Sequence, residues 1–269
     1  MVKVSVLMPV YNTDNTILKQ TIESILNQTF TDFEFLIVND CSTNENVEKI
    51  VLEYQQKDNR IKYFMNEKNL GISGTRNKLI DLSQGEYLAV MDHDDISLPN
   101  RFEKQVEFLD KNLDVGVVAS WYEEFPKTKV VKYPTNDFDI KLHLMRGCVL
   151  LHPSSMIRKK VLIENNLKYE ADFSPAEDYC LWIRLIQFTK FANMPEVLFK
   201  YRLYNDNTSK KQKNKMSLCT FKAYNLIKTE YRNLLELSNN ILGTTKYIKL
   251  FKIIPFLKIT EKYNTKEYK

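Results

Sequence analysis

The sequence predicts an α/β fold with a mostly parallel sheet flanked by helices. Apolar, β-branched runs alternate with segments whose apolar residues recur at helical spacing. Strand, helix and strand in succession give parallel strands joined by right-handed crossovers, so helices cover both faces of the sheet. The expected strands are Val2–Pro9, Phe33–Val38, Ile61–Met65 and Tyr87–Met91. The helices expected after the first three strands carry Ile17 to Leu26, Val47 to Tyr54 and Arg76 to Leu82.

The later elements follow from the same periodicities. Tyr122–Asn136 is polar and has no clear period, which favours a loop or a sheet edge. A helix is expected next, capped by Ser97, with Pro99 in its first turn and a buried stripe from Phe102 to Leu109. The remaining expected elements are, in order, a strand over Val115–Trp121, a helix over Asp137–Met145 and a helix from Tyr179 to Ile186.

Length and composition place the chain among soluble globular proteins. Its 269 residues suffice for one large domain, and we expect one domain followed by an appendage. The 43% hydrophobic and 27% charged residues are ordinary for a soluble protein. The four cysteines lack the paired spacing of zinc or disulfide sites, which fits a reducing cytoplasm. Met1–Pro9 shows no secretion signal, and no apolar run reaches about 20 residues, so we expect a cytoplasmic protein that does not span a bilayer.

Charge is distributed unevenly along the chain. Asn207–Lys269 contains 14 Lys or Arg and 4 Asp or Glu, a net charge of +10, and the residues before it carry −5. Within this stretch Tyr247–Lys258 interleaves basic with aromatic and aliphatic residues, which fits a helix lying on an anionic membrane leaflet. Nucleic acid is a weaker alternative partner and is not expected. Basic helices that are solvated or packed on the rest of the protein would explain the same pattern.

Three carboxylates follow the fourth expected strand directly. Asp92, Asp94 and Asp95 stand at its carboxyl end, where open α/β sheets form their ligand crevices. An Asp-rich surface turn is the simpler interpretation. Three acids within four residues after a buried strand instead favour a divalent metal ion that meets phosphate oxygens.

Polar residues also follow the first two strands. Because parallel strands present their carboxyl ends together, Pro9, Tyr11 and Asn12 are expected to meet Asp40 in a nucleotide-sized crevice. The Asp40 carboxylate suits a base N–H, and the Tyr11 ring suits the face of a base. A helix cap or turn is the alternative role for Asp40.

The loop Asn69–Asn77 leads into a helix and contains Gly71 and Arg76. Backbone N–H groups at a helix start, together with a guanidinium, suit a pyrophosphate. The loop matches neither the dinucleotide fingerprint nor the P-loop, so this signal is weak by itself.

Two later segments carry further candidates. His152 follows an apolar run in a loop, although a lone histidine is more often structural. Glu177 and Asp178 open an amphipathic helix, where acids complement the helix dipole. A carboxylate facing the crevice from this position would also be a good general base for a hydroxyl group.

These features together resemble the family 2 glycosyltransferases, which have the GT-A fold with a Rossmann-like, mostly parallel sheet. The resemblance covers about Lys3 to Ser209. The motifs that carry it are Val4 to Asn12, Gln28-Thr29-Phe30, Asn39 to Thr43, Asn69 and Gly71 with Arg76-Asn77, Asp92-His93-Asp94-Asp95, and Ala176 to Tyr179 with Trp182.

The resemblance implies an inverting transferase that moves a sugar from a UDP-sugar to a hydroxyl group. Asp178 would be the catalytic base, and Asp94 would bind Mn²⁺ or Mg²⁺ bridging the two phosphates, with Asp92 as the second candidate ligand. Pro9, Tyr11 and Asp40 would hold the uridine, Arg76 would lie near the pyrophosphate, and Asp92 would contact the ribose. The full set of expected donor-site residues is Pro9, Tyr11, Asn12, Asp40, Asn69, Gly71, Arg76, Asp92, His152 and Glu177.

Two positions depart from the family pattern. Asn39 stands where many members have Asp, although Asp40 retains the acid expected at the uridine. Tyr204 stands where a His is common. The resemblance therefore does not extend to the role of that His in closing over phosphate or metal.

Ala176–Ser209 is most similar to bacterial transferases that extend lipooligosaccharide or capsule. The sugar expected is a hexose or N-acetylhexosamine, namely GlcNAc, galactose or glucose. The expected acceptor is a hydroxyl group of a surface glycan or of a lipid-linked acceptor. We expect a catalytic domain over residues 1–209, with nucleotide-binding (1–95) and acceptor-binding (96–209) parts. A basic, mainly helical extension over 210–269 would associate peripherally with the cell membrane.

Two other functions fit the pattern less well. A nucleotidyltransferase would need a Gly-rich, basic loop after the first strand, and Pro9–Thr13 has none. A sugar-nucleotide-binding paralogue without activity would have no need to keep all of the acids at Asp40, Asp92, Asp94 and Asp178.

Overall fold

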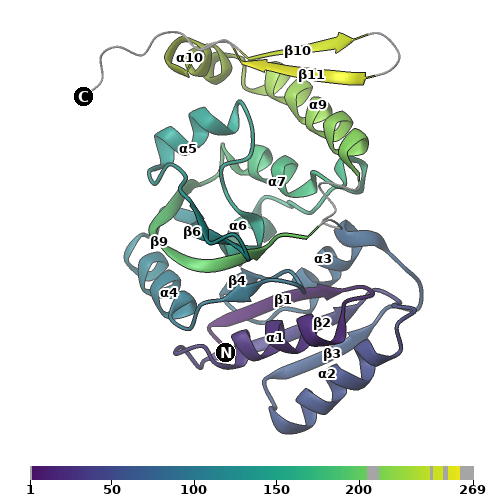
Figure 1. Ribbon diagram of the computed structural model, residues 1–269. Helices are drawn as coiled ribbons and strands as arrows, with labels where there is room; N and C mark the ends of the chain where they lie inside the picture. The colour runs from purple at the N-terminus through teal and green to yellow at the C-terminus, as the bar shows by residue number, and fades with distance from the viewer. Residues whose placement is uncertain (1, 205–211, 243–244, 251–253, 261–269) are drawn as a thin grey trace.

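The computed structural model describes residues 2–204, 212–242, 245–250 and 254–260. Its centre is a nine-stranded sheet in the order β3-β2-β1-β4-β8-β6-β9-β5, with β7 paired to β6 (Figure 1). The strands are β1 (Val4–Val10), β2 (Phe33–Asn39), β3 (Ile61–Met65), β4 (Tyr87–Val90), β5 (Ile96–Ser97), β6 (Val115–Phe125), β7 (Lys129–Val131), β8 (Met156–Arg158) and β9 (Lys190–Arg202).

The first four strands of the chain are parallel, which confirms the prediction. Val10 of β1 lies opposite Asn39 of β2, and Asn39 lies opposite Met65 of β3, so these strands end together. The rest of the sheet is mixed, because β8 runs antiparallel to both β4 and β6. β6 and β9 are parallel to each other and therefore run in the direction of β4. Their carboxyl ends reach the same edge of the sheet.

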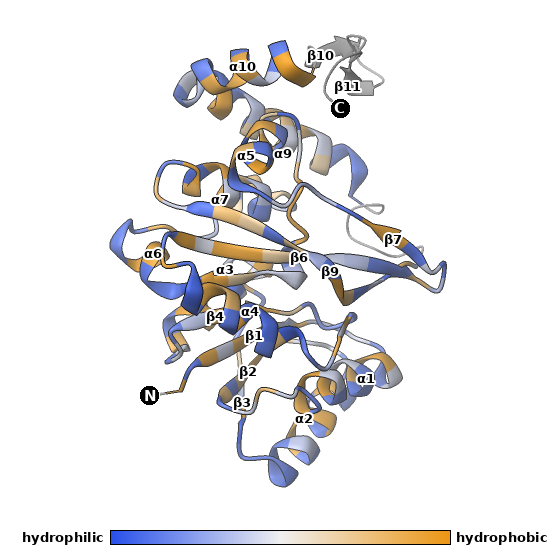
Figure 2. Cartoon of the chain, turned by 90° about the vertical axis from the view of Figure 1, so that its left-hand side faces the viewer, coloured by the Kyte–Doolittle hydropathy of each residue, from blue (hydrophilic) through white to orange (hydrophobic). Residues whose placement is uncertain are grey.

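Helices cover both faces of the sheet, as predicted. One core joins β1 residues such as Val6 to α1, α2 and α4, and a second joins Leu7 to α3, α5 and α7. Figure 2 shows hydrophobic residues concentrated in the central strands and hydrophilic residues mainly on the surrounding helices and loops. The helices are α1 (Asn15–Leu26), α2 (Asn46–Lys57), α3 (Gly71–Leu82), α4 (Arg101–Lys111), α5 (Asp137–Leu144), α6 (Lys159–Glu164) and α7 (Glu177–Leu185).

Two strand segments differ from the sequence expectation. The strand expected over Val115–Trp121 continues to Phe125. The polar stretch Tyr122–Asn136, expected as a loop or a sheet edge, thus contains the end of β6 and the short strand β7 that pairs with it. The long strand β9 was not predicted. Its pairing with β6 skips two residues between Met194 and Val197, and the Pro and Glu there break the alternating pattern.

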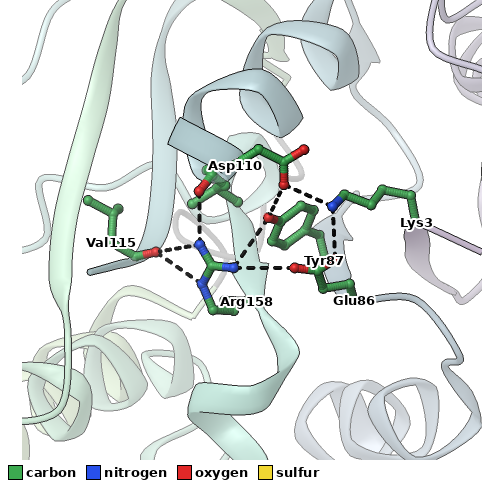
Figure 3. A network of polar contacts seen from close by, with 7 residues as sticks. Lys3, Glu86, Tyr87, Asp110, Val115 and Arg158 are labelled. Atoms are coloured by element: carbon green, nitrogen blue, oxygen red, sulfur yellow. Dashed lines mark hydrogen bonds and ion pairs between the residues drawn. The ribbon is translucent and has the colours of Figure 1, made fainter. Parts of the chain in front are cut away.

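A polar network holds the amino-terminal ends of β1 and β4 in place (Figure 3). The Lys3 ammonium lies 2.8 Å from carboxylate oxygens of both Glu86 and Asp110. The Tyr87 hydroxyl donates to Asp110 at 2.5 Å and accepts from the Arg158 guanidinium at 3.2 Å. These contacts fix β1, β4, β8 and α4 relative to one another. The opposite ends of the strands are thereby held in a defined position at the site edge.

Two helices that follow residue 210 pack on the rest of the protein. Ala223, Tyr224 and Ile227 of α9 (Lys213–Glu230) and Leu235 of α10 (Arg232–Leu242) belong to the same core as α7. The Ser238 hydroxyl donates to the Leu142 carbonyl of α5 at 2.8 Å. In the described part of the chain, no helix is both long and apolar enough to cross a membrane.

The expectation of a helix over Tyr247–Lys258 is wrong for the residues that the structure describes there. They form two antiparallel strands, β10 (Thr245–Leu250) and β11 (Ile254–Thr260), which pair Thr245 with Thr260. Ile, Tyr, Phe and Thr favour extended backbone, and Pro255 would interrupt a helix. Lys210, Lys211 and the last residues of the extension lie outside the described residues.

Candidate active site

Asp40 connects the end of β2 with the loop that opens α3. It is only 5% exposed, and its Oδ1 accepts from the Asn66 amide and the Leu70 backbone N–H, both at 2.8 Å. The Asn69 amide donates to the Asp40 carbonyl at 3.1 Å and accepts from the Gly71 N–H, also at 3.1 Å. Gly71 has a φ of +71°, which a side chain would disfavour. The expected nucleotide loop is therefore built around Asp40.

The end of β1 brings Tyr11 and Asn12 to the loop that follows β2. Pro9 is buried within β1, whereas Tyr11 is 46% exposed beyond the strand end. The Asn12 side chain accepts from the backbone N–H groups of Thr43 and Asn44 at 2.8 and 3.1 Å. Asn12 thus ties the two loops together, while the Tyr11 ring remains accessible for a base.

Arg76 contacts two other expected site residues, Glu177 and Asp92. Its guanidinium donates to Glu177 Oε1 at 2.6 Å and to Asp92 Oδ1 at 2.9 Å, and it lies 5.6 Å from the centre of the Tyr169 ring. Arg76 is 7% exposed, and Glu177 is 4% exposed. The neighbouring carboxylates raise the pKa of Arg76 although its burial opposes this, so the residue carries a full positive charge. Instead of pointing freely at a pyrophosphate, it joins the end of β4 to the start of α7.

Asp178 occupies the first turn of α7 beside this ion pair. Its side chain is partly exposed, and its Oδ1 accepts from the next backbone N–H, that of Tyr179, at 2.7 Å. Desolvation and the charge of Glu177 raise the pKa of Asp178 to about 7, against the opposing effect of Arg76. A carboxylate with this pKa is a suitable general base near neutral pH.

The acids after β4 have different surroundings. The Asp94 side chain is partly exposed and accepts from the Tyr204 hydroxyl. Asp95 is 1% exposed and accepts from the Arg202 backbone N–H at 2.8 Å. Burial, and then the charges of Asp94 and Asp92, hold the pKa of Asp95 well above its usual range. Asp95 therefore supports the loop, as does His93, whose Nδ1 lies 2.8 Å from the Thr13 hydroxyl.

His152 lies beneath the Arg76 cluster. It is 3% exposed, and its Nε2 lies 2.7 Å from the Tyr169 hydroxyl. Its ring centre lies 5.7 Å from that of Trp182. Burial, and to a lesser degree the charge of Arg76, hold the pKa of His152 well below its usual value, so the imidazole is neutral. The structure therefore places His152 as a support for Tyr169 and not at the open edge.

The carboxylates at this edge fit a divalent ion that a substrate helps to bind. Among the residues that the structure describes, no three His, Cys, Asp or Glu side chains form a metal-binding group. Mg²⁺ in phosphate-transferring sites is typically held by one or two carboxylates plus phosphate oxygens, and hard oxygen ligands also suit Mn²⁺. Asp94 and Asp92 would supply the one or two carboxylates of such a donor set.

Sequence reasoning did not identify Tyr169 and Asn66. Asn66 follows β3 directly, so its position at a parallel strand end was an available signal. Tyr169 gave no such signal: it contacts Arg76 and His152, which are distant in sequence, through its ring and hydroxyl.

A sheet with acidic strand ends, faced by a helix that presents Asp178, defines a GT-A-type glycosyltransferase fold. Two solved structures have this fold. S. aureus TarS in complex with UDP-GlcNAc superposes with a TM-score of 0.65 and 21% identity, covering 75% of this chain and 59% of that one. The mannosyltransferase PcManGT from Pyrobaculum calidifontis, in complex with GDP-Man and Mn²⁺, gives a TM-score of 0.68 and 14% identity, covering 87% of this chain and 68% of that one.

Sequence comparison identifies the family. The profile of glycosyl transferase family 2 matches residues 5–168, so the chain belongs to this family. An uncharacterised glycosyltransferase of Methanocaldococcus jannaschii is 38% identical over 249 residues, which cover 88% of this chain and 82% of that protein. The O-antigen biosynthesis glycosyltransferase WbnJ of Escherichia coli is 32% identical over 215 residues, covering 77% of this chain and 82% of WbnJ.

Proposed function

We propose that this glycosyltransferase is metal-dependent, uses a UDP-sugar and inverts the anomeric configuration. The sugar is a hexose or N-acetylhexosamine, with GlcNAc, galactose and glucose as the candidates. The observation that carries the proposal is the partly exposed Asp178 carboxylate at the start of α7, beside the contacts of Arg76 with Glu177 and Asp92. Through these contacts Arg76 joins α7, which carries Asp178, to the end of β4, where the donor binds in this proposal.

In this proposal the donor lies along the edge formed by β1, β2 and β4. Tyr11 covers the uracil and Asp40 accepts from its ring N–H, while Asp92 meets the ribose. Asp94 holds Mn²⁺ or Mg²⁺, which when bound would stabilise the negative charge that develops on the leaving diphosphate. UDP-GlcNAc in TarS and GDP-Man with Mn²⁺ in PcManGT support a nucleotide-sugar donor and a metal.

Asp178 performs the proton transfer in the proposed reaction. Its ionised carboxylate takes the proton of an acceptor hydroxyl as that oxygen attacks the anomeric carbon. The new bond forms on the face opposite the nucleotide while the bond to UDP breaks, so the configuration inverts. Glu177 cannot substitute for the base, because its Oε1 is paired with Arg76 and its side chain is 5% exposed.

The proposed acceptor is a surface glycan or a lipid-linked glycan. The 32% identity to an O-antigen biosynthesis enzyme supports polysaccharide assembly as the pathway. Exposed lysines on α9, among them Lys213, Lys215 and Lys222, supply positive charge that would attract an anionic membrane surface. Residues 1–209 form the catalytic domain in this proposal, and the extension approaches the membrane.

The function is tested by incubating the purified chain with UDP-GlcNAc, UDP-galactose, UDP-glucose and GDP-mannose, each with Mn²⁺ or with EDTA. We expect release of UDP from one UDP-sugar, dependent on the metal. Nucleotide release only from GDP-mannose would refute the donor assignment. Metal-dependent UDP binding without turnover of any donor, even when candidate glycan acceptors are supplied, would indicate the non-catalytic paralogue.

A further inference from the structure

The end of β9 is fastened to the loop that follows β4. The Arg202 backbone N–H donates to Asp95 Oδ1 at 2.8 Å, and its Nε donates to the Asp94 carbonyl at 2.6 Å. Its Nη2 also donates to the Gln20 side chain of α1 at 2.9 Å. The Arg202 guanidinium carbon lies 4.5 Å from the centre of the Phe125 ring. These contacts fix the chain two residues before Tyr204.

Tyr204 extends this attachment to the side chain of Asp94. Its hydroxyl donates to Asp94 Oδ2, across 110 residues of sequence. Both side chains are partly exposed, so solvent reaches the surroundings of this hydrogen bond. A phenol hydroxyl has one hydrogen to donate, so it engages one of the two carboxylate oxygens. Oδ1 of Asp94 is then oriented for another partner.

We propose that Tyr204 is a positioning residue that orients Asp94 for the divalent ion. This inference rests on the proposed function, in which Asp94 is the metal ligand. Ligating carboxylates are generally held by hydrogen bonds from groups outside the coordination sphere, and removing such a partner typically lowers metal affinity about 10- to 100-fold. The Tyr204 hydroxyl would therefore act on the ion only through the Asp94 carboxylate.

The opposite relation is also testable. If the Tyr204 hydroxyl only covered Asp94 in the metal-free protein, it would compete with the ion, and its removal would tighten metal binding. The contacts of Arg202 with Asp94 and Asp95 favour the orienting role, because they fix the end of β9 and so hold the Tyr204 hydroxyl close to Asp94.

The experiment measures Mn²⁺ affinity in the presence of UDP, from the electron paramagnetic resonance signal of free Mn²⁺. Tyr204→Phe should weaken Mn²⁺ binding about 10- to 100-fold, with an unchanged unfolding temperature. Tyr122→Phe is the control, because it removes a hydroxyl that contacts Tyr133 and not Asp94. Its Mn²⁺ affinity should match that of the wild type.

The outcomes separate the inference from the proposed function. Absence of Mn²⁺ binding to the wild type with UDP would refute the metal site itself. Wild-type binding with equal or tighter binding by Tyr204→Phe would overturn the role of Tyr204 alone. A loss of affinity shared by Tyr122→Phe would overturn it as well, because the effect would then be a general one.

Discussion

Replacing Arg76 by Met should destabilise the protein strongly. The guanidinium pairs with Glu177, whose side chain is 5% exposed, and with Asp92, whose side chain is 27% exposed. Water can reach Asp92 in the variant, but Glu177 would remain a buried, unpaired charge. Removing one partner of a buried pair costs about 3–5 kcal/mol. For a chain of this size that corresponds to a fall of roughly 10 °C in the unfolding temperature.

The measurement is urea unfolding followed by circular dichroism. Arg232→Met is the matched control, because its ion pair with Glu236 joins side chains that are 80% and 61% exposed. That change should cost less than about 1 kcal/mol. In the double variant Arg76→Met with Glu177→Met, most of the lost stability should return, because no buried charge is left unpaired. A loss below about 1 kcal/mol in Arg76→Met, or a double variant no more stable than the single one, would refute this reasoning.

Three further predictions follow from the site and the extension. Asp40→Ala should weaken UDP binding about 10- to 100-fold in calorimetry, because a charged acceptor that organises the loop is lost; unchanged affinity would argue against a uridine site there. Asp178→Asn should raise the unfolding temperature at pH 8 and not at pH 4. The pKa of Asp178 is about 7 in the folded protein and 3.8 ordinarily, so the folded state loses stability as pH rises between these values. The amide cannot ionise, so the variant avoids this loss. Reversing the charge of Lys213 and Lys215 to Glu should reduce sedimentation with anionic vesicles, at about 1 kcal/mol per lysine, whereas unchanged sedimentation would exclude α9 as the membrane contact.

The first half of the fold was predictable because its signals are local. Each strand from β1 to β4 is a short apolar run, and each following helix repeats its apolar residues at the spacing of one face. Polar residues follow these strands directly, among them Asp40 and Asp92. They lie at one edge of the sheet because the strands are parallel, and the alternation of strands and helices in the sequence predicts parallel strands. The prediction failed for β9, where Pro195 and Glu196 interrupt the alternation, and for Tyr247–Lys258, where β-branched and aromatic residues outweighed the amphipathic pattern.

Most of the site chemistry depends on pairs that are remote in sequence. Arg76 and Glu177 are 101 residues apart, and Asp94 and Tyr204 are 110 apart, so no local pattern links them. Motif resemblance predicts Asp178 as the base, but the raised pKa of its carboxyl group depends on burial and on the charge of Glu177 in the folded chain. The acidic residues themselves are recognisable from their positions after the predicted strands and at the start of a predicted helix. Folding decides which of them support the loop and which remain accessible.

The pH dependence of kcat tests the central claim, that Asp178 is the base, most directly. Transfer should be slow below pH 6 and rise through a midpoint near pH 7 to a plateau, because only the ionised carboxylate accepts the proton. Asp178→Asn should lose about 10²- to 10⁴-fold in kcat, and its residual activity should lack this midpoint, with UDP affinity unchanged. A midpoint near the ordinary pKa of aspartate, or wild-type transfer by Asp178→Asn, would contradict the assignment.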